Sequence, residues 1–206
     1  MKLYYAETLN PRKACAAARY VGAPVEFVHV DLKSGEHRKP PFLSINPNGK
    51  VPVLEDGENR VWEANAIMGY LARSAGSDFW PSGARQIDVL RWLSWDAQHF
   101  SRHASTLYFE HVIKPIFHLG PPDEIATKEA TGQVRQYARV LDDHLRDRAY
   151  LLGDVLTIAD FAVAAALPYA EQAQIPLAEF PEVRRWHDRL NGLAAWREPF
   201  PQAAAA

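Results

Sequence analysis

Short strand-like patterns of apolar residues alternate with longer helix-like ones at the start of the chain. An apolar run at residues 3–5 is followed by a helical stretch that begins near Pro11, a residue suited to the first turn, and stops at Gly22. Residues 25–31 then alternate apolar and polar side chains with a period of two, which is typical of a strand. This order predicts a β-α-β unit.

A hairpin and a further helix come next. Asp56-Gly57 is typical of a hairpin turn, so Val53-Leu54 and Val61-Trp62 on either side of it are predicted to pair as strands. A helix is predicted from Asn65 to about Ser74. The β-β-α unit completes a first domain over residues 1–76, and residues 77–83 are predicted as a short linker.

From residue 84 onward every long segment has the helical period of apolar residues. A first long helix is predicted from about Ile87 past Phe109, with Pro115 near its end, and a second helix from about Asp123 to Leu145. Residues 84–206 are therefore predicted to form an all-α domain whose last four alanines are frayed.

The start of a third helix at Thr157 carries a strong local signal. Thr157 can cap the third N–H of the helix while the Asp160 carboxylate reaches back to the N–H of Thr157. Leu156 and Phe161 occupy the two positions of a hydrophobic staple. Apolar residues on all sides of the segment indicate that this helix is buried.

Composition narrows the classes of protein to consider. With 48% hydrophobic and 23% charged residues, the chain is typical of a globular protein. A formal net charge of −2 without a basic stripe argues against a nucleic-acid partner. No run approaches the roughly 18 apolar residues of a membrane span, and no signal peptide follows the first strand, so we expect no membrane partner. The single cysteine, Cys15, excludes an internal disulfide and favours a cytoplasmic location.

Residues 46–54, Asn-Pro-Asn-Gly-Lys-Val-Pro-Val-Leu, are the most informative about function. Asn-Pro and Asn-Gly predict a tight turn, and Pro52 pushes Val51 into an extended conformation, which leaves the Val51 backbone free to pair with a ligand. Glu63 follows at the predicted start of a helix. A carboxylate beside free helix N–H groups can hold both ends of an amino acid, so the pattern favours peptide binding.

These residues resemble the glutathione-binding half of the cytosolic glutathione transferase superfamily. The motif of that family is an Asn-Pro-x-Gly-Lys-Val-Pro turn with a cis-proline, followed by a Glu-Ser-x-Ala-Ile helix start, and the capping box and staple resemble the signature of its helical domain. Ala64 departs from the motif, because it stands where the family usually has Ser. The loss of that hydroxyl removes one hydrogen bond to glutathione, worth about 0.5–1.5 kcal/mol.

The resemblance implies both a fold and an activity. The fold is α/β + all-α: an N-terminal thioredoxin-like βαβ-ββα domain followed by an all-helical C-terminal domain. The activity is that of a glutathione transferase, which binds glutathione as co-substrate, activates its thiol, and transfers it to an electrophile or uses it to reduce a disulfide. No metal is implied.

The loop after the first strand must stabilise the thiolate of glutathione. Classes of the family place Tyr, Ser or Cys here, whereas residues 6–13 contain none of these. Thr8-x-Asn10 followed by Lys13 resembles the loop of bacterial nu-like members, which reduce glutathionylated disulfides. That resemblance implies Asn10 and Thr8 as the sulfur ligands, assisted by N–H groups of the first helix.

Two other residues are alternatives for this role. Tyr5 is the rival donor, although alternation sends Tyr4 and Tyr5 to opposite faces of the sheet and favours a core position for Tyr5. Cys15 lies more than a turn inside the predicted helix, where a buried structural role is the more common one.

The resemblance also implies the remaining contacts to glutathione. His37 and Lys50 match a theta-like layout in which both bind the glycyl carboxylate. The backbone of Val51 pairs with the cysteinyl unit as an added strand. Glu63 and the N–H of Ala64 hold the γ-glutamyl end.

A co-substrate pocket is expected beside the first long helix of the second domain. Trp95, His99 and Arg102 fall at i, i+4 and i+7 and share one face, although packing against a neighbouring helix explains Trp95 equally well. His99 and His103 also have the spacing of metal ligands, but no third ligand is evident.

Two questions about partners and activity stay open at this point. The family implies a homodimer, for which Phe79 and Trp80 near the linker are expected to offer exposed apolar surface. A non-catalytic member that keeps the fold as a binding or regulatory module is the alternative function, slightly favoured by Ala64 and by the missing Ser or Cys.

Overall fold

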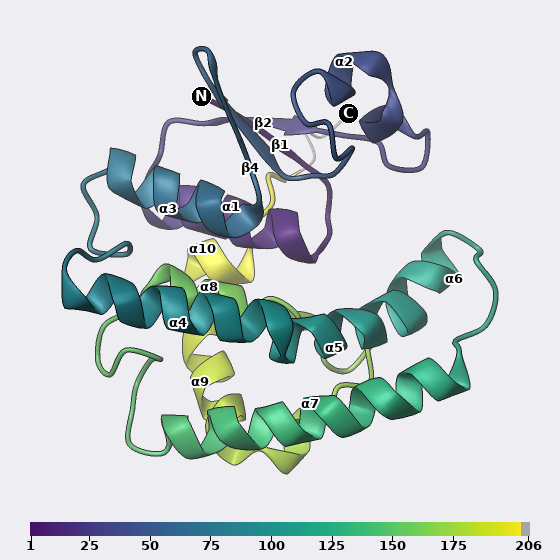
Figure 1. Ribbon diagram of the computed structural model, residues 1–206, viewed down its shortest axis with the longest axis vertical. Helices are drawn as coiled ribbons and strands as arrows, with labels where there is room; N and C mark the ends of the chain where they lie inside the picture. The colour runs from purple at the N-terminus through teal and green to yellow at the C-terminus, as the bar shows by residue number, and fades with distance from the viewer. Residues whose placement is uncertain (203–206) are drawn as a thin grey trace. The chain divides into compact units, whose positions relative to one another are not determined.

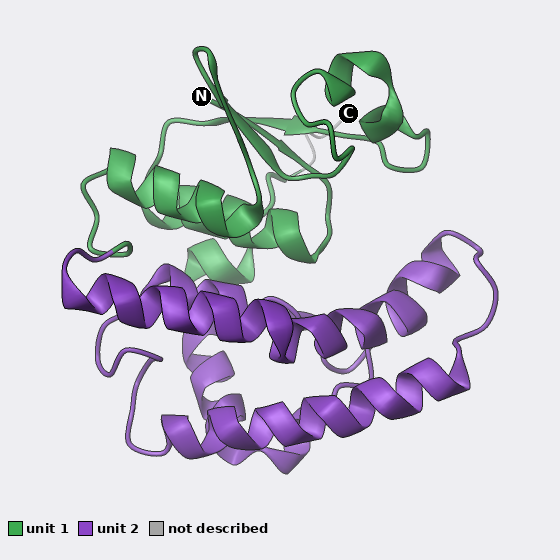
Figure 2. Cartoon of the chain, in the orientation of Figure 1, with its two compact units in different colours: residues 1–80, 193–206 green, residues 81–192 purple. Residues whose placement is uncertain are grey.

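The computed structural model of the chain describes residues 1–202 and divides into two compact units, coloured separately in Figure 2. The first unit comprises residues 1–80 and the described part of the segment that starts at Leu193. The second unit comprises residues 81–192. The segment from Leu193 therefore belongs with the sheet, whereas the sequence pattern placed it with the helical domain. The four terminal alanines lie outside the described residues.

The first unit is built on a four-stranded sheet with the order β2-β1-β3-β4 (Figure 1). β1 is parallel to β2 and antiparallel to β3, and β4 is antiparallel to β3. The strands are β1 (Lys2–Tyr5), β2 (Glu26–His29), β3 (Val53–Asp56) and β4 (Asn59–Trp62). The β-α-β and β-β-α order predicted from the sequence is confirmed.

Helices α1 (Leu9–Tyr20) and α3 (Ala64–Ser74) pack against each other and against one face of the sheet. Their shared core contains Leu3 and Leu54 from the strands and Cys15 and Ile67 from the helices. The other face carries a smaller core of Val30, Phe42 and Val53, in which Phe42 belongs to the short helix α2 (Pro40–Leu43). The 3-10 turn η1 (Glu36–Arg38) precedes α2.

The segment after Leu193 is tied to α1. It contains the short helix α10 (Ala194–Arg197). Arg12 donates from Nη2 to the carbonyl oxygen of Trp196 at 2.5 Å, and Arg19 donates from Nε to that of Pro199 at 2.8 Å. The ring of Phe200 stacks on that of Tyr5, with centroids 5.9 Å apart. These contacts join residues far apart in sequence, so no local pattern predicts them.

The second unit is helical, as predicted. Within it α4 packs on α5 and α8, and α7 packs on α5 and α9. The bounds are α4 (Ala84–Gln98), α5 (Phe100–Tyr108), the π-helical turn η2 (Phe109–Ile113), α6 (Lys114–Ile116), α7 (Glu124–Leu145), α8 (Ile158–Val163), η3 (Leu167–Tyr169), η4 (Leu177–Glu179) and α9 (Pro181–Asn191).

The prediction of one continuous helix from Ile87 past Phe109 is wrong. The backbone leaves the helical region at His99, with φ −119° and ψ −81°, which separates α4 from α5. Ser101 donates to a carboxylate oxygen of the buried Asp96 at 2.6 Å across the break. A side-chain bond of this kind satisfies polar groups at the end of one helix and the start of the next.

The expected capping box at Thr157 is present. The Asp160 carboxylate accepts from the N–H of Thr157 and from the N–H of Leu151, both at 2.9 Å, and from Nε1 of Trp186 at 3.0 Å. Every residue of α8 is buried, as the apolar pattern indicated.

The aromatic residues near the linker do not both lie at the surface. Phe79 is only 2% exposed, and its ring lies 4.7 Å from that of Tyr20 in the same unit. Trp80 is half-buried. The expectation that Phe79 offers exposed apolar surface is therefore wrong.

Candidate active site

A buried asparagine organises the turn at residues 46–52. Asn46 is 2% exposed, and its side-chain amide donates to the carbonyl oxygen of Lys50 at 2.6 Å. The side-chain oxygen of Asn46 accepts from the backbone N–H of Asn48 at 3.0 Å, and the N–H of Gly49 donates to the Asn46 carbonyl at 3.0 Å. The Asn46 side chain thus supplies hydrogen bonds to the backbone of a turn that belongs to no helix or strand.

Val51 follows this turn, and its backbone N–H and C=O are available for pairing with a ligand. The Val51–Pro52 peptide bond is cis, and Val53 then enters β3. Among the described residues, the N–H and C=O of Val51 take part in no hydrogen bond. A backbone with free N–H and C=O groups can pair with the backbone of a peptide.

Lys50 and His37 lie close to each other in the fold because Gly49 packs against η1. A Cβ atom built on Gly49 would lie 3.1 Å from the carbonyl oxygen of His37, and Gly49 has a φ of +58°. Lys50 is exposed, and its ammonium pairs with no group in the described chain. Burial, and then the charge of Arg38, lower the pKa of His37 below its usual value.

The start of α3 presents a carboxylate beside uncapped N–H groups. Glu63 has φ +69° and ψ +118°, an uncommon conformation for a residue with a side chain, and conformations of this kind are found preferentially at functional sites. No side chain caps the helix, and the first internal bond runs from the N–H of Ile67 to the carbonyl of Glu63 at 3.0 Å. The N–H groups of the first turn, that of Ala64 included, thus remain free for an anion.

Thr8 stands directly before α1, as Glu63 stands directly before α3. It is the N-cap residue, with φ −134° and ψ 172°, but its hydroxyl makes no capping bond. The helix begins at Leu9, two residues before the predicted start, because Pro11 at the third helical position needs no N–H partner. Asn10 therefore lies within the first turn, where its side chain is exposed. Lys13, one turn further on, is buried.

The topology brings these three places to one end of the sheet. β1 and β4 both run antiparallel to β3, and Val53 at the start of β3 pairs with Tyr4 and with Trp62 near their C-terminal ends. The loop with Thr8, the turn before Val53 and the helix start at Glu63 therefore lie side by side. The row of groups thus has the cation of Lys50 on one side of Val51 and the carboxylate of Glu63 on the other.

Tyr5 and Cys15 both face the core. Tyr5 is 7% exposed, its ring contacts Phe27 and Phe200, and burial followed by the charge of Glu7 raises its pKa. Cys15 is fully buried, and burial raises the pKa of its thiol. A buried thiol of this kind is a poor nucleophile, because the charged form is destabilised.

The second unit places two of the expected co-substrate residues against α7. The rings of Trp95 and His99 lie 6.2 Å and 4.7 Å from that of Tyr137, and His103 stacks on the same ring. Arg102 is exposed. Because the helix breaks at His99, Trp95 belongs to α4 and Arg102 to α5.

Neither a metal-binding cluster nor a membrane-spanning helix is found among residues 1–202. No cluster of three or more His, Cys, Asp or Glu side chains in this range is arranged to hold a metal ion. No helix in the described part of the chain is long and apolar enough to cross a membrane.

Sequence reasoning missed one polar group at the site. The side-chain carbonyl oxygen of Asn65, next to Ala64 in the first turn of α3, is enclosed and has no hydrogen-bond partner in the described structure. The sequence signal was the polar residue directly after the helix start, but its burial depends on the packing of α3.

Comparisons with known proteins agree with this architecture. The family model "Glutathione S-transferase, N-terminal domain" matches residues 1–73, and "Glutathione S-transferase, C-terminal domain" matches residues 100–194. Glutathione S-transferase 3 of Zea mays is 34% identical over 184 residues, which cover 86% of this chain and 82% of the relative. Glutathione S-transferase F10 of Arabidopsis thaliana is 33% identical, with coverage of 86% and 85%.

Solved structures give the same result. Glutathione S-transferase I from mais, in complex with an atrazine glutathione conjugate, superposes with a TM-score of 0.86 at 25% identity and covers 96% of this chain and 95% of its own. Fold and site thus define a thioredoxin-like domain with a peptide site, joined to a helical domain. The chain belongs to the glutathione S-transferase family. The two sequence relatives are plant enzymes, so they support the family and not the resemblance to bacterial nu-like members.

Proposed function

We propose that this protein is a glutathione transferase whose thiol-activating residues are Thr8 and Asn10. The observation that carries the proposal is the free backbone of Val51 between the cation of Lys50 and the carboxylate of Glu63. Family membership and the conjugate bound to a relative support an enzyme over a non-catalytic binding module.

Glutathione lies along this row of groups in an extended conformation. Its cysteinyl unit pairs with the N–H and C=O of Val51. Its glycyl carboxylate meets Lys50 and a donor of His37, and the ammonium of its γ-glutamyl end meets Glu63. The γ-glutamyl carboxylate accepts from the N–H of Ala64, at the positive end of the α3 dipole.

The thiol then points to the start of α1. A thiol with a pKa of about 8.5 is mostly protonated at neutral pH, and lowering that value by roughly 2 units requires about 2.7 kcal/mol. The Thr8 hydroxyl, the Asn10 amide and the N–H groups of the first turn are the donors available to supply it. Tyr5 is less suited, because its ring is enclosed and its raised pKa makes its hydroxyl a weaker acid.

The thiolate reacts in one of two ways. With an electrophilic carbon, a C–S bond forms as the bond to the leaving group breaks, and the leaving group departs with the electron pair. With a glutathionylated disulfide, the thiolate attacks the glutathione sulfur, glutathione disulfide forms, and the other thiol leaves as a thiolate. The conjugate bound to the maize relative supports the first route, and the Thr8-x-Asn10 loop, resembling nu-like members, supports the second.

The remaining assignments complete the proposal. Trp95, His99 and Arg102 contribute to the co-substrate pocket. The protein acts in the cytoplasm as a homodimer, for which Ile87 and Leu90 on α4, 67% and 44% exposed, offer apolar surface in place of Phe79.

Titration of the thiolate of bound glutathione, followed by its ultraviolet absorbance against pH, tests the proposal. The wild type is expected to show a pKa well below that of free glutathione, and Thr8→Val and Asn10→Ala are expected to raise it. Matched turnover assays with an aryl halide and with a glutathionylated disulfide then separate the two routes. Undetectable glutathione binding would refute the proposal.

A further inference from the structure

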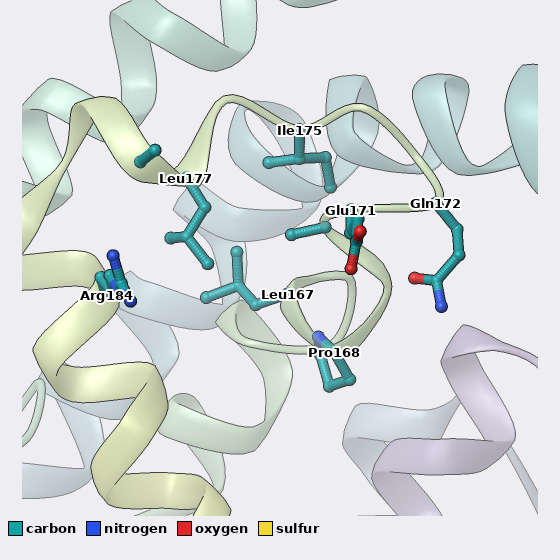
Figure 3. Close-up of a pocket in the computed structure, with 9 residues that line it drawn as sticks. Leu167, Pro168, Glu171, Gln172, Ile175, Leu177 and Arg184 are labelled. Carbon is teal, nitrogen blue, oxygen red and sulfur yellow. The ribbon is translucent and has the colours of Figure 1, made fainter.

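A concavity lies within the helical unit, built from residues that the proposed glutathione site does not use. Its volume is about 590 Å³, within the range of small-molecule pockets. Its lining comes from η3, the loop after it, η4 and α9 (Figure 3), and includes Leu167, Glu171, Gln172, Ile175, Leu177 and Arg184.

The charged groups that line this pocket are unpaired, whereas charged residues on the adjoining surface form ion pairs. On the adjoining surface Arg135 donates three hydrogen bonds of 2.7–3.0 Å to Glu179, and Arg185 pairs with Glu182 at 2.7 Å. Arg184 and Glu171 are exposed, and within residues 1–202 their side chains form no ion pair or hydrogen bond. Both charged side chains that line the pocket are therefore unpaired within the described residues.

The arrangement of the lining separates these charges. In Figure 3 Arg184 lies at one side of the pocket and Glu171 toward the other, next to Gln172. Leu167, Leu177 and Ile175 lie between them. A ligand that follows the lining meets a cation, an apolar stretch, and then an anion with an amide beside it.

We propose that this pocket binds short peptides with free termini and an apolar middle residue. A purely anionic ligand would meet the carboxylate of Glu171, and a purely cationic one would meet Arg184. A zwitterion whose charges are several atoms apart satisfies both: its carboxylate pairs with Arg184, its ammonium with Glu171, and its side chain covers the leucines.

The test uses the whole protein and the tripeptide Ala-Leu-Ala, which has no thiol and no γ-linkage. Titration followed by amide chemical shifts of the labelled protein is expected to show saturable millimolar binding, with shifts concentrated at residues 167–184. The titration is repeated in Glu63→Gln, which removes one group of the proposed glutathione site. N-acetylation and C-amidation of the peptide are each expected to weaken binding about threefold to fivefold, as for exposed ion pairs.

Variants assign each charge to its partner. In Glu171→Gln the N-acetyl and free peptides should bind equally, and in Arg184→Gln the amidated and free peptides should bind equally. Arg85→Gln, an exposed arginine outside the lining, is the matched control and should behave as the wild type. Ala178→Trp, at an exposed lining position, should fill the pocket and abolish binding of all forms.

Several outcomes would overturn the proposal. These are no saturable shift at tens of millimolar peptide, loss of the shifts at residues 167–184 in Glu63→Gln, unchanged binding in Ala178→Trp, or equal sensitivity to capping in all variants. Each outcome leaves the glutathione site untouched, because that site is tested separately by the thiolate titration.

Discussion

Replacing Asp160 by Ala should destabilise the protein far more than the loss of an ordinary helix cap. The buried carboxylate accepts four hydrogen bonds, from the N–H groups of Leu151 and Thr157, the Thr157 hydroxyl and Nε1 of Trp186. These donors come from a loop, the start of α8 and the helix α9, so one side chain joins three segments of the second unit.

The magnitude of this loss follows from those donors. Each buried donor left without a partner costs about 1–3 kcal/mol, while removal of a desolvated carboxylate recovers part of that cost. We expect a net loss of about 3–5 kcal/mol in the free energy of unfolding. For a chain of this size the corresponding fall in Tm is roughly 6–20 °C.

Asp123→Ala is the matched control. Asp123 caps α7, and its carboxylate accepts from the N–H groups of Ile125 and Ala126 at 2.9 Å and 3.0 Å, but this helix end is exposed to water. Its loss should cost about 1 kcal/mol. Urea denaturation of both variants, with circular dichroism as the probe, makes the comparison. An Asp160→Ala protein no less stable than Asp123→Ala would refute the reasoning.

Asp160 should also make the stability of the protein depend on pH. Burial raises the pKa of Asp160 to about 6 in the folded protein, from a value of 3.8. Between these values the folded state binds more protons than the unfolded state, so this group contributes stability that is full below about pH 4 and is lost as the pH rises through 6. The stability advantage of the wild type over Asp160→Ala should therefore shrink from pH 4 to pH 7. An advantage that grows over this range would contradict the assignment.

The other predictions concern the proposed glutathione site. Glu63→Gln should weaken glutathione binding more than tenfold in calorimetry, since the γ-glutamyl ammonium loses its partner, and unchanged affinity would place the site elsewhere. Ala64→Ser should tighten binding by up to about 1 kcal/mol through one added donor, and weaker binding would show a pocket organised around alanine. Thr8→Val and Asn10→Ala should each raise the pKa of the bound thiol by up to about a unit, or roughly 1.4 kcal/mol, while a large shift in Tyr5→Phe alone would make Tyr5 the donor. Light scattering should give the mass of a dimer, and a mass of one chain at micromolar concentration would contradict that expectation.

Local chemistry determined much of what the sequence could predict. The turn at residues 46–52, the hairpin at Asp56-Gly57 and the capping box at Thr157 each depend on residues a few positions apart, whose backbone preferences act without help from distant contacts. Together with the apolar pattern of residues 3–31, the first two signals were sufficient for the β-α-β and β-β-α order of the first unit, but not for η1 and α2. With the resemblance they carry, they also identified the family.

Other features depended on contacts that no local pattern contains. The helical period continues through His99, yet the helix breaks there, where Ser101 bonds to the buried Asp96 and the ring of His99 packs on Tyr137. Packing energy gained by the side chains outweighs the local preference to continue the helix.

What the sequence by itself determined was the chemistry at each position: a free Val51 beside Pro52, a carboxylate at Glu63, and a threonine ahead of the first helix. The tertiary structure decided which of these groups meet. The strand register brings them to one end of the sheet, and the segment after Leu193 packs under α1 through Arg12 and Trp196. The physical reason is that register and long-range burial are set by summed apolar contacts between distant segments, whereas turns and caps are set by neighbouring residues.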